Sequence, residues 1–235
     1  MDPANLHDRL SRVRETIAGA AGRSGRDAAS VRLVAITKGH SAAALRAALE
    51  AGLGEIGENR VQEALAKFGE VHDALESAGT TRHLVGPLQR NKARDAVALF
   101  DWIQSIDSSR IARAVSDRAE SERAEPLPVL IEVNVAGEEQ RHGFAPDETA
   151  DAALEVAELP GLSLRGLMAM APYTDDEATL RRTFASVRRL WEEVRRQGAE
   201  VDTLSMGMSN DYALAIEEGS TMIRLGTALL GPRGG

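Results

Sequence analysis

The first apolar run of the chain reads Val31-Arg32-Leu33-Val34-Ala35-Ile36-Thr37-Lys38. Its length and its β-branched residues predict a buried strand. The run ends on a lysine, although only three of the 28 Lys and Arg residues are lysines. A desolvated amine can lose its proton and attack a carbonyl to form a Schiff base, whereas a guanidinium stays protonated. Lys38 is therefore either a reactive amine or an ordinary strand-end lysine that reaches solvent.

Seven further short runs follow, and a helix of about Asn5 to Ala21 precedes them all. The predicted strands are Val31–Lys38, Glu55–Glu58, Arg82–Gly86, Trp102–Asp107, Pro128–Val135, Leu164–Met170, Thr203–Met208 and Met222–Gly226. Helical spacing fills the gaps between them. One predicted apolar helix face comprises Val61, Ala64, Leu65 and Phe68, and another comprises Leu180, Phe184, Val187, Trp191 and Val194.

Strands that alternate with helices at this spacing imply parallel pairing through right-handed crossovers. Eight such units predict an α/β fold: one closed (β/α)8 TIM barrel over residues 1–235, with an extra N-terminal helix. An open doubly wound sheet would show the same alternation. The second run is short, so a count of seven strands is the other alternative.

Composition excludes several classes of protein. The net charge is −8 without a basic cluster, which argues against nucleic acid and anionic membrane as partners. The absence of cysteine excludes disulfides and thiolate metal sites. No apolar stretch approaches the roughly 20 residues of a membrane span. The N-terminal sequence lacks a basic and then apolar signal pattern, so we expect a cytoplasmic protein.

Residues that could bind a ligand or take part in a reaction follow the predicted strands, where a barrel carries its functional groups. They are Lys38, Glu58, Asn59, Gly86–Gln89, Asp107, Asn134, Gly137, Met170, Tyr173, Ser205–Ser209 and Arg224–Thr227. Turn formation alone explains Gly, Asn and Ser in loops. It does not explain the lysine and the arginine.

Two segments near the C-terminus have the features of an anion site. Gly207-Met208-Ser209-Asn210-Asp211 lies before a predicted helix, and Gly226-Thr227 follows the eighth run. Free N–H groups at helix starts favour phosphate, and barrels commonly bind it after strands seven and eight. The segment Ser209–Asp211 could instead serve only as a helix N-cap, or do both.

An amine, an anion site and the guanidinium of Arg224 between them match pyridoxal phosphate, which offers an aldehyde, a phosphate arm and a ring nitrogen. A carboxylate beside that nitrogen would keep it protonated and make the ring a strong electron sink. An arginine there disfavours protonation. Such a site favours holding the cofactor, or mild chemistry, over demanding carbanion chemistry.

The chain resembles the YggS/PROSC family of pyridoxal phosphate homeostasis proteins, whose fold is similar to the N-terminal barrel of bacterial alanine racemase. The matching stretches are Val34–Lys38, Gly57–Asn59, His83–Lys92, Gly166–Met170, Leu204–Asp211, Gly219–Thr227 and Gly231. They run in order along nearly the whole chain. The block Ser205-Met206-Gly207-Met208-Ser209 is highly specific.

The resemblance implies a role for seven residues. Lys38 would hold the cofactor as an aldimine, Ser209, Gly226 and Thr227 would bind its phosphate, Arg224 would face the pyridine nitrogen, and Asn59 and His83 would line the ring pocket. Two positions depart from the family pattern: Arg60 replaces a usual tyrosine, and Arg141 replaces a usual lysine. The second departure puts in doubt any secondary cofactor site that needs that amine.

By this resemblance the protein stores, buffers or delivers pyridoxal 5′-phosphate without substantial catalysis, as a monomer or weak dimer. Its candidate partners are apo forms of enzymes that need the cofactor. One alternative is an amino-acid racemase, which needs a second base, Tyr173 or Tyr212 here. The racemase resemblance places that base on an additional domain, which we expect to be absent because the chain ends at Gly235. A Schiff-base aldolase-like barrel without cofactor is the third reading.

The remaining polar residues carry weaker signals. The five histidines lack metal spacing, and His7 and His72 are expected to face solvent from helices. Lys67 and Lys92 are expected to be solvated. Glu58 is expected to be a strand-end carboxylate, and an acid that supports the site is the less favoured alternative. Two further residues, Trp102 and Trp191, are expected to pack in the core or between helix and barrel.

Overall fold

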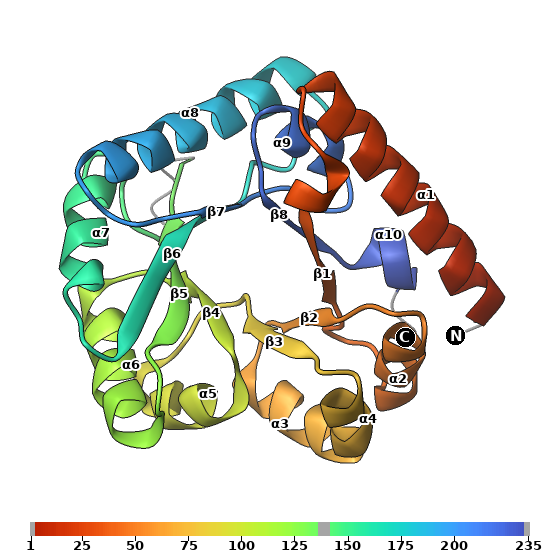
Figure 1. The fold of residues 1–235 in the computed structure, drawn as a ribbon, viewed down its shortest axis with the longest axis horizontal. Helices are drawn as coiled ribbons and strands as arrows, with labels where there is room; N and C mark the ends of the chain where they lie inside the picture. Colours follow the sequence, from red (N-terminus) through yellow and green to blue (C-terminus); the bar gives the residue numbers. More distant parts are fainter. Residues whose placement is uncertain (1–2, 136–141, 233–235) are drawn as a thin grey trace.

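A computed structural model describes residues 3–135 and 142–232 of the chain. Eight parallel strands close into a barrel in sequence order, β1 next to β2 and finally β8 next to β1 (Figure 1). The strands are β1 (Arg32–Ile36), β2 (Glu55–Glu58), β3 (Thr81–Leu84), β4 (Trp102–Ile106), β5 (Leu127–Val133), β6 (Leu162–Ala169), β7 (Thr203–Ser205) and β8 (Met222–Leu225). The predicted barrel and all eight predicted strands are confirmed, which excludes the open sheet.

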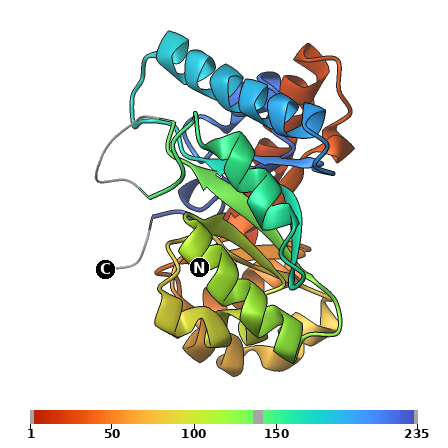
Figure 2. The same cartoon turned by 90° about the vertical axis from the view of Figure 1, so that its left-hand side faces the viewer.

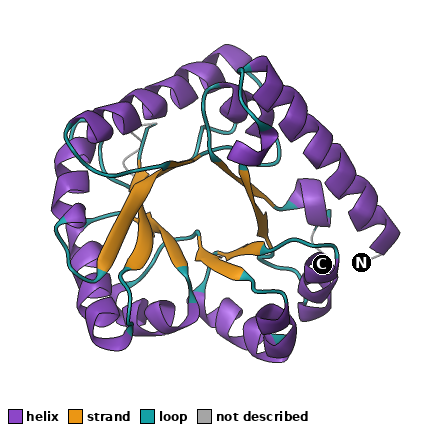
Figure 3. Cartoon of the chain, in the orientation of Figure 1, coloured by secondary structure: helices purple, strands orange, loops and turns teal. Residues whose placement is uncertain are grey.

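Helices form a ring around the strands (Figure 3). They are α1 (Pro3–Arg23), α2 (Ala42–Glu50), α3 (Val61–Glu70), α4 (His72–Ser77), α5 (Ala93–Leu99), α6 (Ser109–Glu122), α7 (Thr149–Ala157), α8 (Glu177–Arg196), α9 (Tyr212–Glu217) and α10 (Thr227–Leu230), with 3-10 turns at Ala28–Ser30 and Arg90–Lys92. α7 and α8 lie next to each other outside β6 (Figure 2). None of the helices in residues 3–135 and 142–232 is long and apolar enough to span a membrane.

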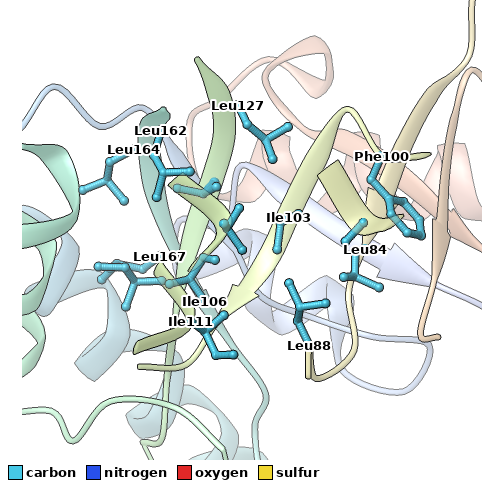
Figure 4. Packing of buried hydrophobic residues seen from close by; sticks show 14 of the residues in the cluster. Leu84, Leu88, Phe100, Ile103, Ile106, Ile111, Leu127, Leu162, Leu164 and Leu167 are labelled. Atoms are coloured by element: carbon cyan, nitrogen blue, oxygen red, sulfur yellow. The ribbon is translucent and has the colours of Figure 1, made fainter. Parts of the chain in front are cut away.

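The main core lies between the outer faces of the strands and the surrounding helices. Figure 4 shows part of it: Leu84 lies beside the ring of Phe100, and Ile103, its partner on the neighbouring strand, belongs to the same cluster. α8 buries Leu180, Phe184, Val187 and Val194, and Trp191 packs partly buried against the same cluster. The predicted face of this long helix is therefore confirmed. The burial of apolar area at this interface is the main favourable term for such a fold.

The N-terminal helix α1 covers the barrel beside its closing strands. Its apolar positions Leu6, Leu10, Val13 and Ile17 are buried in a cluster with β1, β8, α9 and α10. The predicted extra helix is confirmed, and it is two residues longer at each end than the sequence indicates. This helix packs against the segments that follow β7 and β8, and so it supports the part of the barrel that carries the predicted anion site.

Seven of the eight strands end one to three residues earlier than predicted, which lengthens the loops at one end of the barrel. β1 ends at Ile36, so Lys38 lies in the turn that follows it. β7 ends at Ser205 because Gly207 adopts a φ of 99°, outside the strand region. A Cβ on Gly207 would lie 2.7 Å from the Cβ of Ala215, so glycine is also needed for the close approach of α9.

Candidate functional site

A cavity of about 530 Å³ opens at the carboxyl ends of the strands. This volume is within the range of small-molecule sites. Its lining includes six of the seven residues assigned to cofactor binding from sequence: Lys38, Asn59, Ser209, Arg224, Gly226 and Thr227. The structure therefore brings together residues from the loops after β1, β2, β7 and β8. It does not bring His83 into the cavity.

Lys38 is half-buried in the turn after β1. Hydrogen bonds between buried neighbours hold this turn in place. Thr37 is fully buried, and its hydroxyl donates a 2.5 Å hydrogen bond to Oε1 of Glu58 at the end of β2. The same oxygen accepts a 2.6 Å hydrogen bond from Nζ of Lys67. The prediction that Lys67 is solvated is wrong, because its side chain is only 6% exposed. Glu58 is fully buried and is more than a strand-end carboxylate.

Asn59 is placed by a close contact between two loops. It follows β2 directly, and the loop after β3 passes beside it at Gly86. A Cβ on Gly86 would collide with the carbonyl oxygen of Asn59, so only glycine allows this packing. The hydroxyl of Ser105 donates a 2.6 Å hydrogen bond to the carbonyl of Gly86 and holds the loop in position. Asn59 consequently has a fixed place on the cavity wall.

The predicted anion site is formed by the loops after β7 and β8. The hydroxyl of Ser209 accepts a 3.2 Å hydrogen bond from the backbone N–H of Ala228 at the start of α10. This bond joins the two loops on one side of the cavity. Asp211 occupies the N-cap position of α9, but its side chain bonds the N–H of Met208 at 2.6 Å instead of capping the helix. The segment Ser209–Asp211 is therefore built to close a loop around the cavity, and its capping role is minor.

Arg224 presents its guanidinium at the inner end of the cavity. The residue is 4% exposed and belongs to β8. Its Nη1 donates to the carbonyl of Ser205 at 2.9 Å and to the hydroxyl of Ser205 at 2.5 Å. Its Nη2 donates to the carbonyl of Ala169 at 2.9 Å. A guanidinium carries five N–H groups, so two of them remain beyond those three bonds in a residue that lines the cavity.

The charge of this guanidinium persists at neutral pH. Burial lowers the pKa of Arg224 to about 10, while attraction to Glu132 and Asp211 opposes the decrease. Burial also raises the pKa of both carboxyl groups, and Arg224 limits the rise. Sequence reasoning missed Glu132. Its signal is a single acidic residue within the otherwise apolar strand Leu127–Val133.

A directed chain of polar contacts leads from Arg224 to the opposite end of the barrel. The hydroxyl of Ser205 donates to Oε1 of Gln104 at 2.7 Å, and Nε2 of Gln104 lies 3.0 Å from Nδ1 of His83. An amide nitrogen can only donate, so Nδ1 accepts and the ring proton is on Nε2. That atom lies 3.2 Å from a carboxylate oxygen of Glu55. His83 thus faces the strand starts, which corrects its predicted place in the ring pocket.

His83 gives the first testable prediction, which concerns pH. Burial lowers the pKa of His83, and the attraction of Glu55 does not reverse this. The unfolded chain takes up the imidazole proton below about pH 6.5, whereas the folded protein does not, so stability falls as pH decreases through that value. His83→Gln should reduce this fall by up to about 1.4 kcal/mol per pH unit. Denaturant unfolding of both proteins between about pH 7.5 and 5 checks this, and equal slopes would contradict it.

Other residues named from sequence lie at the edge of the site or outside it. Tyr173 lines the cavity mouth and is 92% exposed. Tyr212 is partly buried and packs against the cluster of α1. Asn134 follows β5 and is half-buried. Gly137 and Arg141, with the question of a secondary cofactor site, lie outside the described residues.

The remaining predictions about solvent and packing have clear outcomes. His7 and His72 are exposed, as predicted. Trp102 is partly buried and packs against the interior residues of the barrel, with the guanidinium of Arg32 4.6 Å from its ring centre. Lys92 is partly exposed and lies 3.7 Å from Asp95. Neither tryptophan is part of the cavity lining.

Comparisons with family models, curated proteins and solved structures all match this chain to one group of barrel proteins. The family model for the alanine racemase N-terminal domain matches residues 9–234. The pyridoxal phosphate homeostasis protein of Pseudomonas aeruginosa is 40% identical over 230 residues, 98% of this chain and 96% of the relative. That of Escherichia coli K12 is 40% identical over 227 residues, 95% of each chain. The structure of Synechococcus elongatus PipY with PLP bound has a TM-score of 0.84 and 36% identity, and covers 96% of this chain and all of PipY.

Proposed function

Because this chain belongs to the family of pyridoxal phosphate homeostasis proteins with an alanine racemase N-terminal barrel, we propose that it holds pyridoxal 5′-phosphate on Lys38 and stores or delivers it. The bound cofactor supplies an aldehyde that condenses with an amine, forming a C=N bond and releasing water. In this proposal the Lys38 amine is the partner in that bond. The loops after β7 and β8 receive the phosphate, and Arg224 meets the ring nitrogen.

One observation carries the proposal: an amine, two joined loops that bear hydroxyl groups, and a buried guanidinium line a single cavity. Lys38 comes from the turn after β1, and Ser209 and Thr227 come from the joined loops after β7 and β8. Arg224 lies at the inner end, with its guanidinium fixed by Ser205 and Ala169. These groups fit the three functional parts of the cofactor, an aldehyde, a phosphate and a ring nitrogen.

Arg224 supports a function in binding without substantial catalysis. With a pKa of about 10 it is charged at neutral pH. A neighbouring positive charge disfavours protonation of the pyridine nitrogen, and an unprotonated ring withdraws electrons weakly. Substrate carbanions would therefore receive little stabilisation. We infer that the protein releases or passes the cofactor to apo-enzymes that require it.

A racemase remains the second candidate function, because Tyr173 lies on the cavity wall. A racemase needs a proton donor and acceptor on opposite faces of the reacting carbon. Tyr173 is almost fully exposed and so lacks the burial that would hold its hydroxyl in one position. Tyr212 is outside the cavity lining and packs on the core. Neither tyrosine has the enclosed setting expected of a racemising base, and so we favour the carrier.

The phosphate assignment gives a second prediction. Ser209→Ala and Thr227→Ala should each weaken binding of pyridoxal 5′-phosphate much more than binding of pyridoxal, because each variant loses a hydrogen bond to a charged group. We expect a loss on the order of 1.5–3 kcal/mol for the phosphorylated ligand. Titration calorimetry with both ligands measures the difference. Equal weakening of both ligands would instead assign these hydroxyls to the fold or to the ring pocket.

A further inference from the structure

Hydrogen bonds fix the backbone on both sides of Lys38. The carbonyl of Thr37 accepts a 2.7 Å hydrogen bond from Nζ of Lys67. The N–H of Gly39 donates a 2.6 Å hydrogen bond to Oε1 of Glu63. Lys38 lies between these two bonded residues, in a turn that neither β1 nor α2 contains. The two bonds together limit how far the backbone of this turn can move.

A compact ion-pair cluster supplies both of these bonds. Nζ of Lys67 lies 2.6 Å from Glu58 and 3.2 Å from Glu63. Glu58 also accepts the hydroxyl of Thr37, as described above, so the cluster holds that residue by its side chain and its carbonyl. An ammonium group with three donors suits three oxygen acceptors around one point, whereas the planar guanidinium of arginine does not. This requirement explains a lysine in a chain that otherwise uses arginine.

Stability is a poor explanation for this cluster. Burying two charges costs several kcal/mol per ion, and apolar residues of similar volume often serve a fold equally well. Burial raises the pKa of Glu58 despite its bonds to Lys67 and Thr37, which is the electrostatic sign of that cost. Within the described part of the chain, its Oε2 atom is buried without a hydrogen-bond partner. This electrostatically costly cluster therefore contacts the residues on either side of Lys38.

We propose that Lys67, Glu58 and Glu63 are positioning residues that hold the turn Thr37–Gly39 so that the Lys38 amine faces the cavity in the geometry needed to bond an aldehyde. This inference rests on the proposed function and adds residues outside the cavity lining to it. Bond formation requires the reacting atoms to be closely aligned, and a shift of about 1 Å can reduce a rate about a hundredfold. A turn tied at both ends prevents such a shift.

The test compares two substitutions at Glu63, which is only partly buried. Glu63→Ala removes the acceptor for the N–H of Gly39, whereas Glu63→Gln keeps an acceptor oxygen of the same reach. We expect Glu63→Ala to slow bond formation between pyridoxal 5′-phosphate and Lys38 about tenfold or more, and Glu63→Gln to restore most of it. Stopped-flow absorbance gives the rate, and borohydride trapping with mass spectrometry gives the labelled residue.

A double variant, Glu58→Gln with Lys67→Met, removes both charges of the buried pair at once and leaves only the partly exposed carboxylate of Glu63. Lys92→Met, which removes a lysine remote from the turn, is its matched control. The double variant should bond the aldehyde at least about tenfold more slowly. It should bind pyridoxamine 5′-phosphate, which has no aldehyde, as the wild type does. Thermal melting verifies that each variant is folded.

The outcomes separate this inference from the proposed function. If the wild type carries no label at Lys38, both are overturned. If the wild type is labelled and folded Glu63→Ala reacts at the wild-type rate, only the positioning role is overturned. If aldehyde and amine ligands weaken equally in the variants, the cluster supports the whole cavity and the positioning role is again rejected. Slower bond formation with unchanged binding of pyridoxamine 5′-phosphate supports the positioning role. If the double variant does not fold, the comparison of Glu63→Ala with Glu63→Gln decides alone.

Discussion

Borohydride reduction of the protein loaded with pyridoxal 5′-phosphate is expected to attach a pyridoxyl group to Lys38, and Lys38→Ala is expected to abolish this label completely. Of the three lysines, Lys38 lines the cavity. The amine of Lys67 is enclosed by Thr37, Glu58 and Glu63, and Lys92 lies beside Asp95 on the surface. An amine that is 6% exposed and already bonds two carboxylates and a carbonyl is inaccessible to an aldehyde in the cavity.

The measurement is peptide mapping by mass spectrometry, together with a visible absorption spectrum. The loaded wild type should be yellow, and Lys38→Ala should bind the cofactor without that colour. Lys92→Ala serves as the control and should keep both colour and label. A label found mainly at Lys92 would overturn the assignment of Lys38. A wild type that never becomes coloured would favour the aldolase-like reading instead.

Turnover of free amino acids by the loaded protein is expected to lie far below the ordinary enzyme range of roughly 1–10³ s⁻¹. In the proposed arrangement the charged guanidinium of Arg224 would leave the ring nitrogen unprotonated, and Tyr173 is 92% exposed and so lacks an enclosed position in the cavity. Racemisation followed by chirality-sensitive detection measures this, with a known racemase as positive control. The same loaded protein should restore activity to an apo-enzyme that needs the cofactor.

Arg224→Glu supplies the matched variant for the prediction of low amino-acid turnover. A carboxylate at this position would favour protonation of the ring nitrogen, so the absorption spectrum of the loaded protein should change. Turnover in the ordinary range by the wild type, lost on replacing Tyr173 or Tyr212, would contradict a carrier without substantial catalysis. An unchanged spectrum in a folded Arg224→Glu variant would show that this side chain does not contact the ring nitrogen.

Much of the fold was predictable because strand and helix periods are local properties of a sequence. The short second strand, Glu55–Glu58, has the predicted limits although its composition is poor in apolar residues. β7 is shorter than predicted because Gly207 leaves the strand region of backbone conformation. The position of a glycine is visible in a sequence, but the φ angle it adopts depends on what packs against it, here α9.

The site was predictable to the extent that strand ends converge in a barrel. Lys38, Ser209, Arg224 and Thr227 meet for that reason. His83 was assigned to the ring pocket by the resemblance alone, and a matching motif does not show how deep in a barrel a side chain lies. Val85, two residues further along, lines the cavity, while His83 lies deeper among Gln104 and Glu55.

The face of α3 was misjudged for a different reason. The pattern predicts that Leu65 is buried, yet it is 58% exposed, and Lys67 is buried in its place. Helical spacing counts lysine as polar and therefore assigns it to the outer face. Only Glu58 and Thr37, from other elements, make the inward orientation favourable. A buried ion pair depends on both partners, and periodicity along one helix cannot reveal the second.

The enclosure of Lys67 also affects how an aldehyde would behave after it leaves the cavity. Aldehydes condense with any accessible amine, so a lysine-rich surface scavenges them in unproductive adducts. Here one of the three lysine side chains is shielded by the fold, and another is a partly exposed residue beside Asp95. The arginines that provide most of the positive charge do not form such adducts. Under the proposed function, a released aldehyde would therefore meet few competing lysines on the surface of this protein and would stay available to a recipient.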